Sequence, residues 1–397
     1  MHAALTKLSS LGHLALRSAL DRAARVAVRG ADSPAGEGPL VIVRVDAIGD
    51  FVVWLASAEA LVARYRPRRV VLIANRLVAE LARATGIFDE VVPLDVRAFQ
   101  KQRGYRFSML RRVRALGAAI AIQPTYSRAF WMGDALIRAT GAPERIGQQG
   151  DLNNIRPWQR RLSDRWYTRL VAPVVLSRHE MQRNADFLRA LGVASAAPTC
   201  ARLGPVGARP DALDTGRAYF VVMPGAGSPR RMWPVERFAA LARRVAAAQD
   251  LRLVICGSLG EKGLAEALAR AAGLDDTLVL AGQTSVPQLV ETIRGARLTI
   301  ANDSSAIHIA AAVGAPSLCL LGGGHYARFL PYPETAQNLG PENRPACVHA
   351  AMACFNCNWQ CSQPHGPQGP FPCVEAITLE SATTAALRQL DLRELHS

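Results

Sequence analysis

The sequence predicts an α/β protein with two consecutive parallel sheets. Two observations support this prediction: the chain has 397 residues, and short β-branched runs alternate with helical patterns in two separate series. At roughly 150 residues per domain, the length predicts two or three domains. A hydrophobic content of 50% with 20% charged residues excludes intrinsic disorder as the overall state.

The first series follows a segment rich in glycine and proline, residues 30–39, which is typical of a linker. Leu40 to Val45 is a short β-branched run, as expected of a buried parallel strand. The strands expected after it are Val70–Ala74, Glu90–Leu94 and Ala118–Gln123. The helices expected between the strands are one through Trp54, Leu55, Ala58 and Leu61 that ends at Pro67, one at Val78–Ala84, and an arginine-rich helix before the last strand.

The second series begins after a region rich in proline and glycine, Ala194–Gly216. Its expected strands are Ala218–Met223, Leu251–Cys256, Thr277–Leu280, Leu298–Ala301 and Ser317–Leu321. The helices expected between them are Val235–Ala248, Lys262–Ala272, Val286–Arg294 and Ser304–Val313.

The chain therefore divides into four expected parts. Residues 1–38 are an amphipathic helix and linker, 39–200 and 216–345 are two Rossmann-like domains, and 346–397 are a cysteine-rich loop with a C-terminal helix. Ligands of such sheets bind beyond the carboxyl ends of the strands, so a cleft between the two halves is the expected site.

Positive charge is concentrated in the first half of the chain. Residues 1–215 hold 32 basic and 18 acidic side chains, against 15 and 14 in the remainder, and all but three of the basic residues are arginine. This excess predicts an anionic partner such as nucleic acid, an anionic lipid or a phosphorylated sugar. The alternative explanation is the arginine bias of a GC-rich genome.

The sequence predicts a cytoplasmic protein. No stretch reaches the ~18 apolar residues of a membrane span, and Arg17, Asp21, Arg22 and Arg25 interrupt any secretory signal near the N-terminus. Leu5 to Val28 is a basic amphipathic pattern, which indicates a helix packed on its own domain or lying on a membrane surface.

Two segments of the second half are candidate phosphate sites. Asp303, Ser304 and Ser305 stand between an expected strand and helix, where capping or phosphate binding both explain them, and His308 follows one turn later. Another expected strand ends in a glycine-rich loop, Met223 to Pro234, which contains Arg231. Glycines allow close backbone approach to a diphosphate, and an arginine supplies positive charge.

Four cysteines near the C-terminus have the spacing of metal ligands: Cys354, Cys357, Cys361 and Cys373. A cytoplasmic location disfavours disulfides, so we expect a structural iron or zinc ion that fixes this loop. Cys347 and His349 are alternative ligands.

In combination the motifs resemble glycosyltransferase family 9, the ADP-heptose:lipopolysaccharide heptosyltransferases. Met223–Pro234 is similar to the PGAS…K-x-WP element of the family, and Ala281–Ser285 to its AGKTS segment. Asn302–His308 resembles its D-[ST]-G-x-x-H signature, and Arg44–Asp50 its R-x-x-x-[IML]-G-D motif. The resemblance covers roughly residues 40–380.

The resemblance implies a GT-B arrangement, in which two Rossmann-like domains face a central cleft. It implies that the first domain binds the acceptor, that the second binds the nucleotide sugar, and that the transfer is inverting and needs no metal or other cofactor. Asp50 corresponds to the general base, Arg231 to a phosphate-binding lysine and Glu261 to a ribose-binding glutamate. The implied donor-binding residues are Gly225, Gly227, Ser228, Arg231, Glu261, Asp303, Ser304, Ser305 and His308.

The sequence departs from the family pattern at one position of this site. Ser305 stands where the family has glycine, and a side chain there crowds the phosphate. Some family members carry a similar cysteine segment, and a protein-directed heptosyltransferase branch binds iron through it.

The expected function is transfer of a heptose from ADP-heptose to a hydroxyl of lipopolysaccharide core oligosaccharide. A second interpretation, favoured by the cysteines, is a protein O-heptosyltransferase acting on an autotransporter adhesin. A third, a nucleic-acid-binding protein, lacks a recognition motif, so no nucleic-acid partner is expected. The arginine-rich half would face an anionic glycolipid or protein acceptor, with Arg97–Arg114 and Arg156–Arg169 as contacts, and associate peripherally with the inner membrane.

Overall fold

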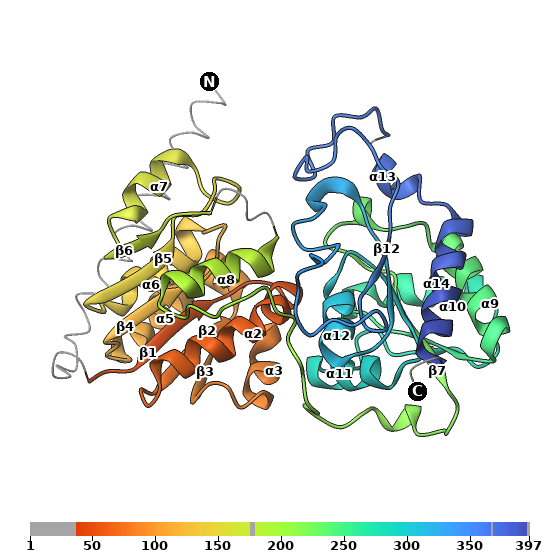
Figure 1. Cartoon of the computed structure of the whole chain (residues 1–397), viewed down its shortest axis with the longest axis horizontal. Coiled ribbons are helices and arrows are strands. Elements are labelled where there is room, and N and C mark those ends of the chain that lie inside the picture. Colours follow the sequence, from red (N-terminus) through yellow and green to blue (C-terminus); the bar gives the residue numbers. More distant parts are fainter. Residues whose placement is uncertain (1–36, 175–178, 367, 395–397) are drawn as a thin grey trace. The chain divides into compact units, whose positions relative to one another are not determined.

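The computed structural model describes residues 37–174, 179–366 and 368–394 (Figure 1). The amphipathic helix expected at residues 5–28 lies outside the described part. The chain forms two compact units, each described here by itself. The first contains the described residues before 48 together with 58–174 and 186–195, and the second contains 48–57, 179–185 and the described residues from 196 onward.

The first unit is built on a six-stranded parallel sheet of order β3-β2-β1-β4-β5-β6, the order of a dinucleotide-binding fold. Its strands are β1 (Leu40–Arg44), β2 (Val70–Asn75), β3 (Glu90–Leu94), β4 (Ile120–Gln123), β5 (Glu144–Gln148) and β6 (Arg169–Val171). The central strand β1 is buried along its whole length, which explains its uninterrupted run of apolar residues.

Helices connect successive strands of this sheet. They are α2 (Ile48–Tyr65), whose first half belongs to the second unit, α3 (Ala79–Ala84), α4 (Val96–Lys101), α5 (Arg103–Ala115), α6 (Ala135–Thr140) and α7 (Pro157–Asp164). Helix α8 (Glu180–Ala190) follows the last strand, β6, and its residues 180–185 belong to the second unit. A core of valine, leucine and methionine side chains from the strands, α5 and α6 fills the space between sheet and helices.

The second unit repeats the topology, with strand order β12-β11-β10-β7-β8-β9 and parallel pairing throughout. Its strands are β7 (Tyr219–Met223), β8 (Arg252–Ile255), β9 (Leu278–Val279), β10 (Thr299–Asn302), β11 (Ser317–Leu320) and β12 (Ala346–Val348). Its helices are α9 (Val235–Gln249), α10 (Lys262–Ala272), α11 (Val286–Gly295), α12 (Ser305–Val313), α13 (Pro372–Glu375) and α14 (Leu379–Glu394).

The predicted α/β class with two parallel sheets is therefore confirmed, and each strand predicted from a β-branched run is present. Strands β5, β6 and β12 were not predicted. Strand β5 has the sequence ERIGQ and β6 has only three residues, so neither carries the apolar pattern of a buried strand. Strand β12 lies inside the segment predicted as a cysteine-rich loop and pairs with β11. Among the described helices, none combines the length and hydrophobicity of a membrane-spanning segment.

Candidate functional site

The glycine-rich loop after β7 is held by a buried asparagine at the end of β10. Asn302 donates a hydrogen bond to the Pro224 carbonyl (2.7 Å) and accepts one from the backbone N–H of Trp233 (2.9 Å). The Trp233 indole N–H donates to the Ile377 carbonyl (3.0 Å), and its ring is buried. The loop that holds Gly225 and Gly227 is thus fixed at both of its ends.

Arg231 lies against this loop and beside Asp303. A Cβ added at Gly227 would lie 3.3 Å from Arg231 Nη1, so the absence of a side chain there lets the guanidinium approach the backbone. The guanidinium carbon lies 4.1 Å from the centroid of the Trp359 ring. Among the described residues, Arg231 Nε is buried and has no hydrogen-bond partner. Burial lowers the pKa of Arg231, and the nearby Asp303 carboxylate opposes that shift.

The start of α12 presents donors that lack protein partners. Ser304 is the N-cap residue, with extended backbone, yet its hydroxyl makes no capping hydrogen bond. That hydroxyl oxygen is buried without a hydrogen-bond partner in the part of the chain that the structure describes. The first turn of a helix also carries free N–H groups and the positive end of the helix dipole. This end of α12 is therefore suited to an anion, and Ser305 is its first helical residue.

Asp303 precedes this helix start and takes up a proton at a higher pH than an ordinary aspartate. Burial raises the pKa of Asp303 to about 6, and Arg231 opposes the rise.

His308 is buried in the first half of α12 and is neutral at physiological pH. Its Nδ1 lies 2.7 Å from the Tyr332 hydroxyl, and the two rings are stacked. Burial lowers the pKa of His308 to about 3, and His179 adds to that shift. Because Nδ1 is hydrogen-bonded to Tyr332, Nε2 is the ring nitrogen that can bind a ligand.

Asp50 stands in the first turn of α2, within the part of that helix that belongs to the second unit. The residue before it, Gly49, packs on α12: a Cβ added there would lie 3.0 Å from His308 Cδ2 and 3.4 Å from Ser305 Cα. The predicted base is therefore next in sequence to a residue that contacts the start of α12. The half-buried side chain of Asp50 makes polar interactions of its own.

Glu261, predicted to bind the ribose of the donor, forms a capping box with Ser258 in this structure. Its Oε2 accepts hydrogen bonds from the Ser258 backbone N–H (2.6 Å) and hydroxyl (2.8 Å). Its other oxygen lies against the glycine loop, since a Cβ at Gly225 would stand 1.7 Å from Glu261 Oε1. The structure thus joins the glycine loop and the β8–α10 turn through one carboxylate.

The four predicted metal ligands gather around one pocket. Cys354, Cys357, Cys361 and Cys373 line it together with Trp359 and Phe371. The pKa of Cys373 is raised by burial and by the other three thiols, which are close enough to act on it. No cluster of three or more side chains already placed to hold a metal ion occurs within the described ranges. The alternative ligands do not line this pocket: Cys347 is hydrogen-bonded to Cys319, and the His349 ring packs on Tyr326 and Phe355.

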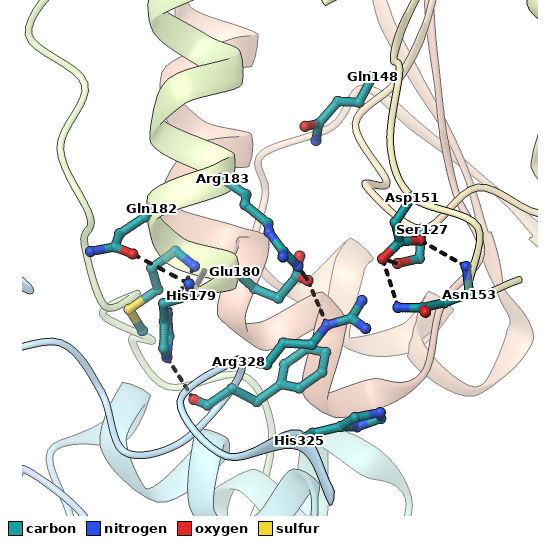
Figure 2. Close-up of polar contacts among 12 residues, drawn as sticks. Ser127, Gln148, Asp151, Asn153, His179, Glu180, Gln182, Arg183, His325 and Arg328 are labelled. Atoms are coloured by element: carbon teal, nitrogen blue, oxygen red, sulfur yellow. Dashed lines mark hydrogen bonds and ion pairs between the residues drawn. The ribbon is translucent and has the colours of Figure 1, made fainter. Parts of the chain in front are cut away.

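Polar residues that the sequence analysis missed lie at the carboxyl edge of the first sheet. Asp46, which follows β1, pairs with Arg44 (2.8 Å) and accepts a hydrogen bond from the Thr125 hydroxyl (3.1 Å). In the same unit Asp151 accepts hydrogen bonds from the hydroxyl of Ser127 (2.9 Å) and the side chain of Asn153 (2.7 Å), as Figure 2 shows. These short polar side chains follow strands, which is the one sequence signal that could have identified them.

A second missed group belongs to the second unit. Glu180, at the start of α8, accepts hydrogen bonds from Arg183 (2.8 Å) and Arg328 Nε (2.9 Å), and His179 Nε2 lies 2.8 Å from the Phe329 carbonyl (Figure 2). These contacts hold the segment that leads to Tyr332, the partner of His308. The residues lie about 150 positions apart, so no local pattern in the sequence connects them.

Comparison with known proteins identifies the family. The profile of glycosyltransferase family 9 (heptosyltransferase) matches residues 114–358, which is more than half of the chain. Lipopolysaccharide heptosyltransferase 3 of Escherichia coli K12 is 27% identical over 236 residues, 57% of this chain. Lipopolysaccharide heptosyltransferase 1 of Pseudomonas aeruginosa is 30% identical over 165 residues, 41% of this chain. The matches span 65% and 44% of these two relatives.

Solved structures show the same fold. The ADP-heptose lipopolysaccharide heptosyltransferase II of E. coli superposes with a TM-score of 0.63 at 17% identity, covering 90% of this chain and 99% of that one. A family 9 glycosyltransferase from Veillonella parvula superposes with a TM-score of 0.69 at 17% identity, covering 91% and 98%. The two parallel sheets, the order of the motifs and the match over more than half of its length together establish that this chain belongs to glycosyltransferase family 9.

Proposed function

We propose that this protein transfers a heptose from ADP-heptose to an acceptor hydroxyl, with inversion and with Asp50 as the general base. One observation above all supports the proposal: the Ser304 hydroxyl and Arg231 Nε are both buried and have no hydrogen-bond partner among the described residues. The two are close in space, because Asp303 is next to Ser304 in the sequence and near enough to Arg231 to act on its pKa. Buried polar groups without partners are costly, and a bound diphosphate would satisfy both. Family membership supplies the substrate class.

The chemistry requires two kinds of group. As the acceptor oxygen attacks the anomeric carbon, its proton must pass to a base, and negative charge builds on the departing diphosphate. Asp50 takes the proton in our proposal. The backbone N–H groups of α12, the Ser304 hydroxyl and the Arg231 guanidinium stabilise the charge on the diphosphate, so groups of the protein itself can stabilise this leaving group.

The acceptor is proposed to be lipopolysaccharide core oligosaccharide. The two relatives are lipopolysaccharide heptosyltransferases by name. Asp46, Thr125, Ser127 and Asp151, at the carboxyl edge of the first sheet, are of the short polar type that binds sugar hydroxyls. This function places the enzyme in the cytoplasm, at the inner membrane where its glycolipid acceptor is built. A protein acceptor remains the second candidate, favoured by the cysteine loop.

The test of the proposal separates binding from catalysis. Asp50→Asn is expected to bind ADP as tightly as the wild type and to lower the rate of heptose transfer to isolated core oligosaccharide by at least ~10²-fold, as loss of a general base does. Glu59→Gln, an exposed carboxylate on the same helix, is the matched control and is expected to keep full activity. Full turnover by Asp50→Asn would remove Asp50 from this role. Transfer to an adhesin passenger but not to core oligosaccharide would favour the protein acceptor.

We further propose that the four cysteines bind a structural iron or zinc ion. Four thiols around one pocket form a donor set suited to either metal. The ion would stabilise the loop that carries Trp359, the residue packed on Arg231. Elemental analysis of the purified protein tests this: about one iron or zinc per chain supports the proposal, and neither metal refutes it.

A further inference from the structure

Four arginines surround a cavity in the first unit that the proposed reaction does not use. Arg114, Arg138, Arg145 and Arg165 line it with Trp166 and Gly141, and its volume is about 400 Å³. Arg114 comes from the last turn of α5, Arg138 from the last turn of α6, and Arg165 is the C-cap residue of α7. Three helices and one strand thus bring together four positive charges that lie up to 51 positions apart in the sequence.

The cavity lies at the edge of the sheet where its strands begin. Arg145 is the second residue of β5, and the other three arginines are at the C-terminal ends of α5, α6 and α7, each of which leads into a strand of the sheet. In a parallel sheet all strands start at one edge and end at the other, where Asp46 and Gln148 lie. At about 3.3 Å per residue, the two edges of this five-residue strand are ~13 Å apart. Arg114 and Arg165, predicted from the sequence as contacts of the acceptor, lie near the edge where the strands begin.

Part of this cluster is explained by the helix ends that it covers. Arg114 Nη1 donates to the Thr140 carbonyl (3.0 Å), and Arg145 donates to the carbonyls of Trp166 (2.5 Å) and Ala142. Arg138 stacks on the Trp166 ring at 4.4 Å. These contacts fix the positions of the guanidinium groups, so the cavity is lined by charges that are held in place.

Two of these arginines, Arg114 and Arg165, have donors without an ion-pair or hydrogen-bond partner among the described residues. Arg114 Nε is buried and has no hydrogen-bond partner within the described segments, and over the same residues Arg165 forms no ion pair. The carboxylates nearest in sequence act elsewhere: Asp164 pairs with Arg128, and Glu144 raises the pKa of Tyr65. Arg145 is half-buried, and this burial lowers its pKa. Such a cluster is stabilised by an anion that accepts several hydrogen bonds.

We propose that this cavity, the arginine pocket, binds a phosphate-bearing group. Planar guanidinium groups fit phosphate oxygens in pairs, and four of them around one cavity suit a phosphate monoester or diphosphate rather than a single carboxylate. The volume accommodates more than a lone phosphate, and the Trp166 ring provides an apolar wall. The ligand is either a soluble phosphate compound or the phosphate of an anionic lipid headgroup. This site is independent of the proposed catalytic site in the second unit.

Calorimetric titration with inorganic pyrophosphate tests the proposal on the full-length protein. Arg165→Glu is expected to weaken binding by about 10- to 100-fold, the usual effect of losing a charge-assisted hydrogen bond. Arg112→Glu, the same change at an exposed position of α5 outside the cavity, is the matched control and is expected to stay within about twofold of wild type, as a screened surface charge does. Arg231→Ala removes the other candidate diphosphate site and is expected to leave this binding in place.

Further measurements distinguish the two sources and guard against misfolding. Thermal unfolding checks each variant, and Arg165→Gln repeats the test without reversing the charge. Sedimentation with phosphatidylglycerol vesicles, compared with phosphatidylcholine vesicles, tests the lipid: loss in Arg165→Glu but not in Arg112→Glu assigns the pocket to lipid phosphate. Pyrophosphate binding without vesicle binding assigns it to a soluble compound. Equal weakening in Arg165→Glu and Arg112→Glu, loss of all binding in Arg231→Ala, or absence of binding to both probes would overturn the proposal.

Discussion

Acidification is predicted to destabilise the second unit through two buried histidines. His308 and His179 are almost fully buried, and burial lowers their pKa values to about 3 and about 4. An unfolded chain titrates its histidines near pH 6.5. Because the unfolded state takes up protons first, the stability contributed by each neutral histidine is complete above pH 6.5. It is lost as the pH falls toward the folded-state pKa.

The size of the effect follows from these pKa values and one opposing group. Each histidine costs about 1.4 kcal/mol per pH unit below 6.5, so the pair removes about 4 kcal/mol between pH 7 and pH 5. Asp303 acts in the other direction, because its folded-state pKa is raised to about 6. Below pH 6 the folded state holds this proton more tightly, which returns about 1.4 kcal/mol by pH 5. The expected net loss is about 2.5 kcal/mol.

Urea unfolding followed by tryptophan fluorescence at pH 7 and pH 5 measures this loss. In the variant His308→Gln one titrating imidazole is gone, so the difference in unfolding free energy between the two pH values should shrink by about 2 kcal/mol. Asp303→Asn should instead enlarge it by about 1.4 kcal/mol. The comparison between pH values is independent of any constant destabilisation by the substitution. If wild type and His308→Gln lose the same free energy on acidification, His308 is not held neutral and the reasoning fails.

Two further predictions concern the donor site, and a third concerns the cysteine loop. Gly225→Ala would place a methyl group 1.7 Å from Glu261 Oε1 and displace that carboxylate, so the KM for ADP-heptose should rise at least ~10-fold. Circular dichroism should show that this variant is folded. Trp359→Ala removes the ring 4.1 Å from Arg231 and should raise the same KM about 3- to 30-fold, the range of a partly desolvated cation–π contact, whereas Trp359→Phe should restore most of it. Dialysis against a metal chelator should lower the melting temperature by several degrees if the cysteines hold an ion, and an unchanged value would contradict the metal proposal.

Local patterns explain why much of the fold could be predicted. Buried parallel strands such as Leu40–Arg44 and Thr299–Asn302 are short, mostly apolar runs, and their length, β-branched residues and flanking turn residues identify them. Strand β5 could not be found in this way, because three of its five residues are charged or polar and its place is set by pairing with β4. The helix starts at Val235 and Ser305 were predicted within one residue, because a proline or serine precedes each of them.

The sequence by itself determined the order of the elements and the position of each motif, because these depend on residues that are neighbours along the chain. It also placed Asp303 and Ser304 at a helix start and the glycines in a strand-to-helix loop. Only the tertiary structure decided which residues from distant segments meet. It set Trp359 on Arg231, Tyr332 on His308 and four arginines around one cavity, because burial and the parallel pairing of strands bring together side chains that no sequence spacing relates.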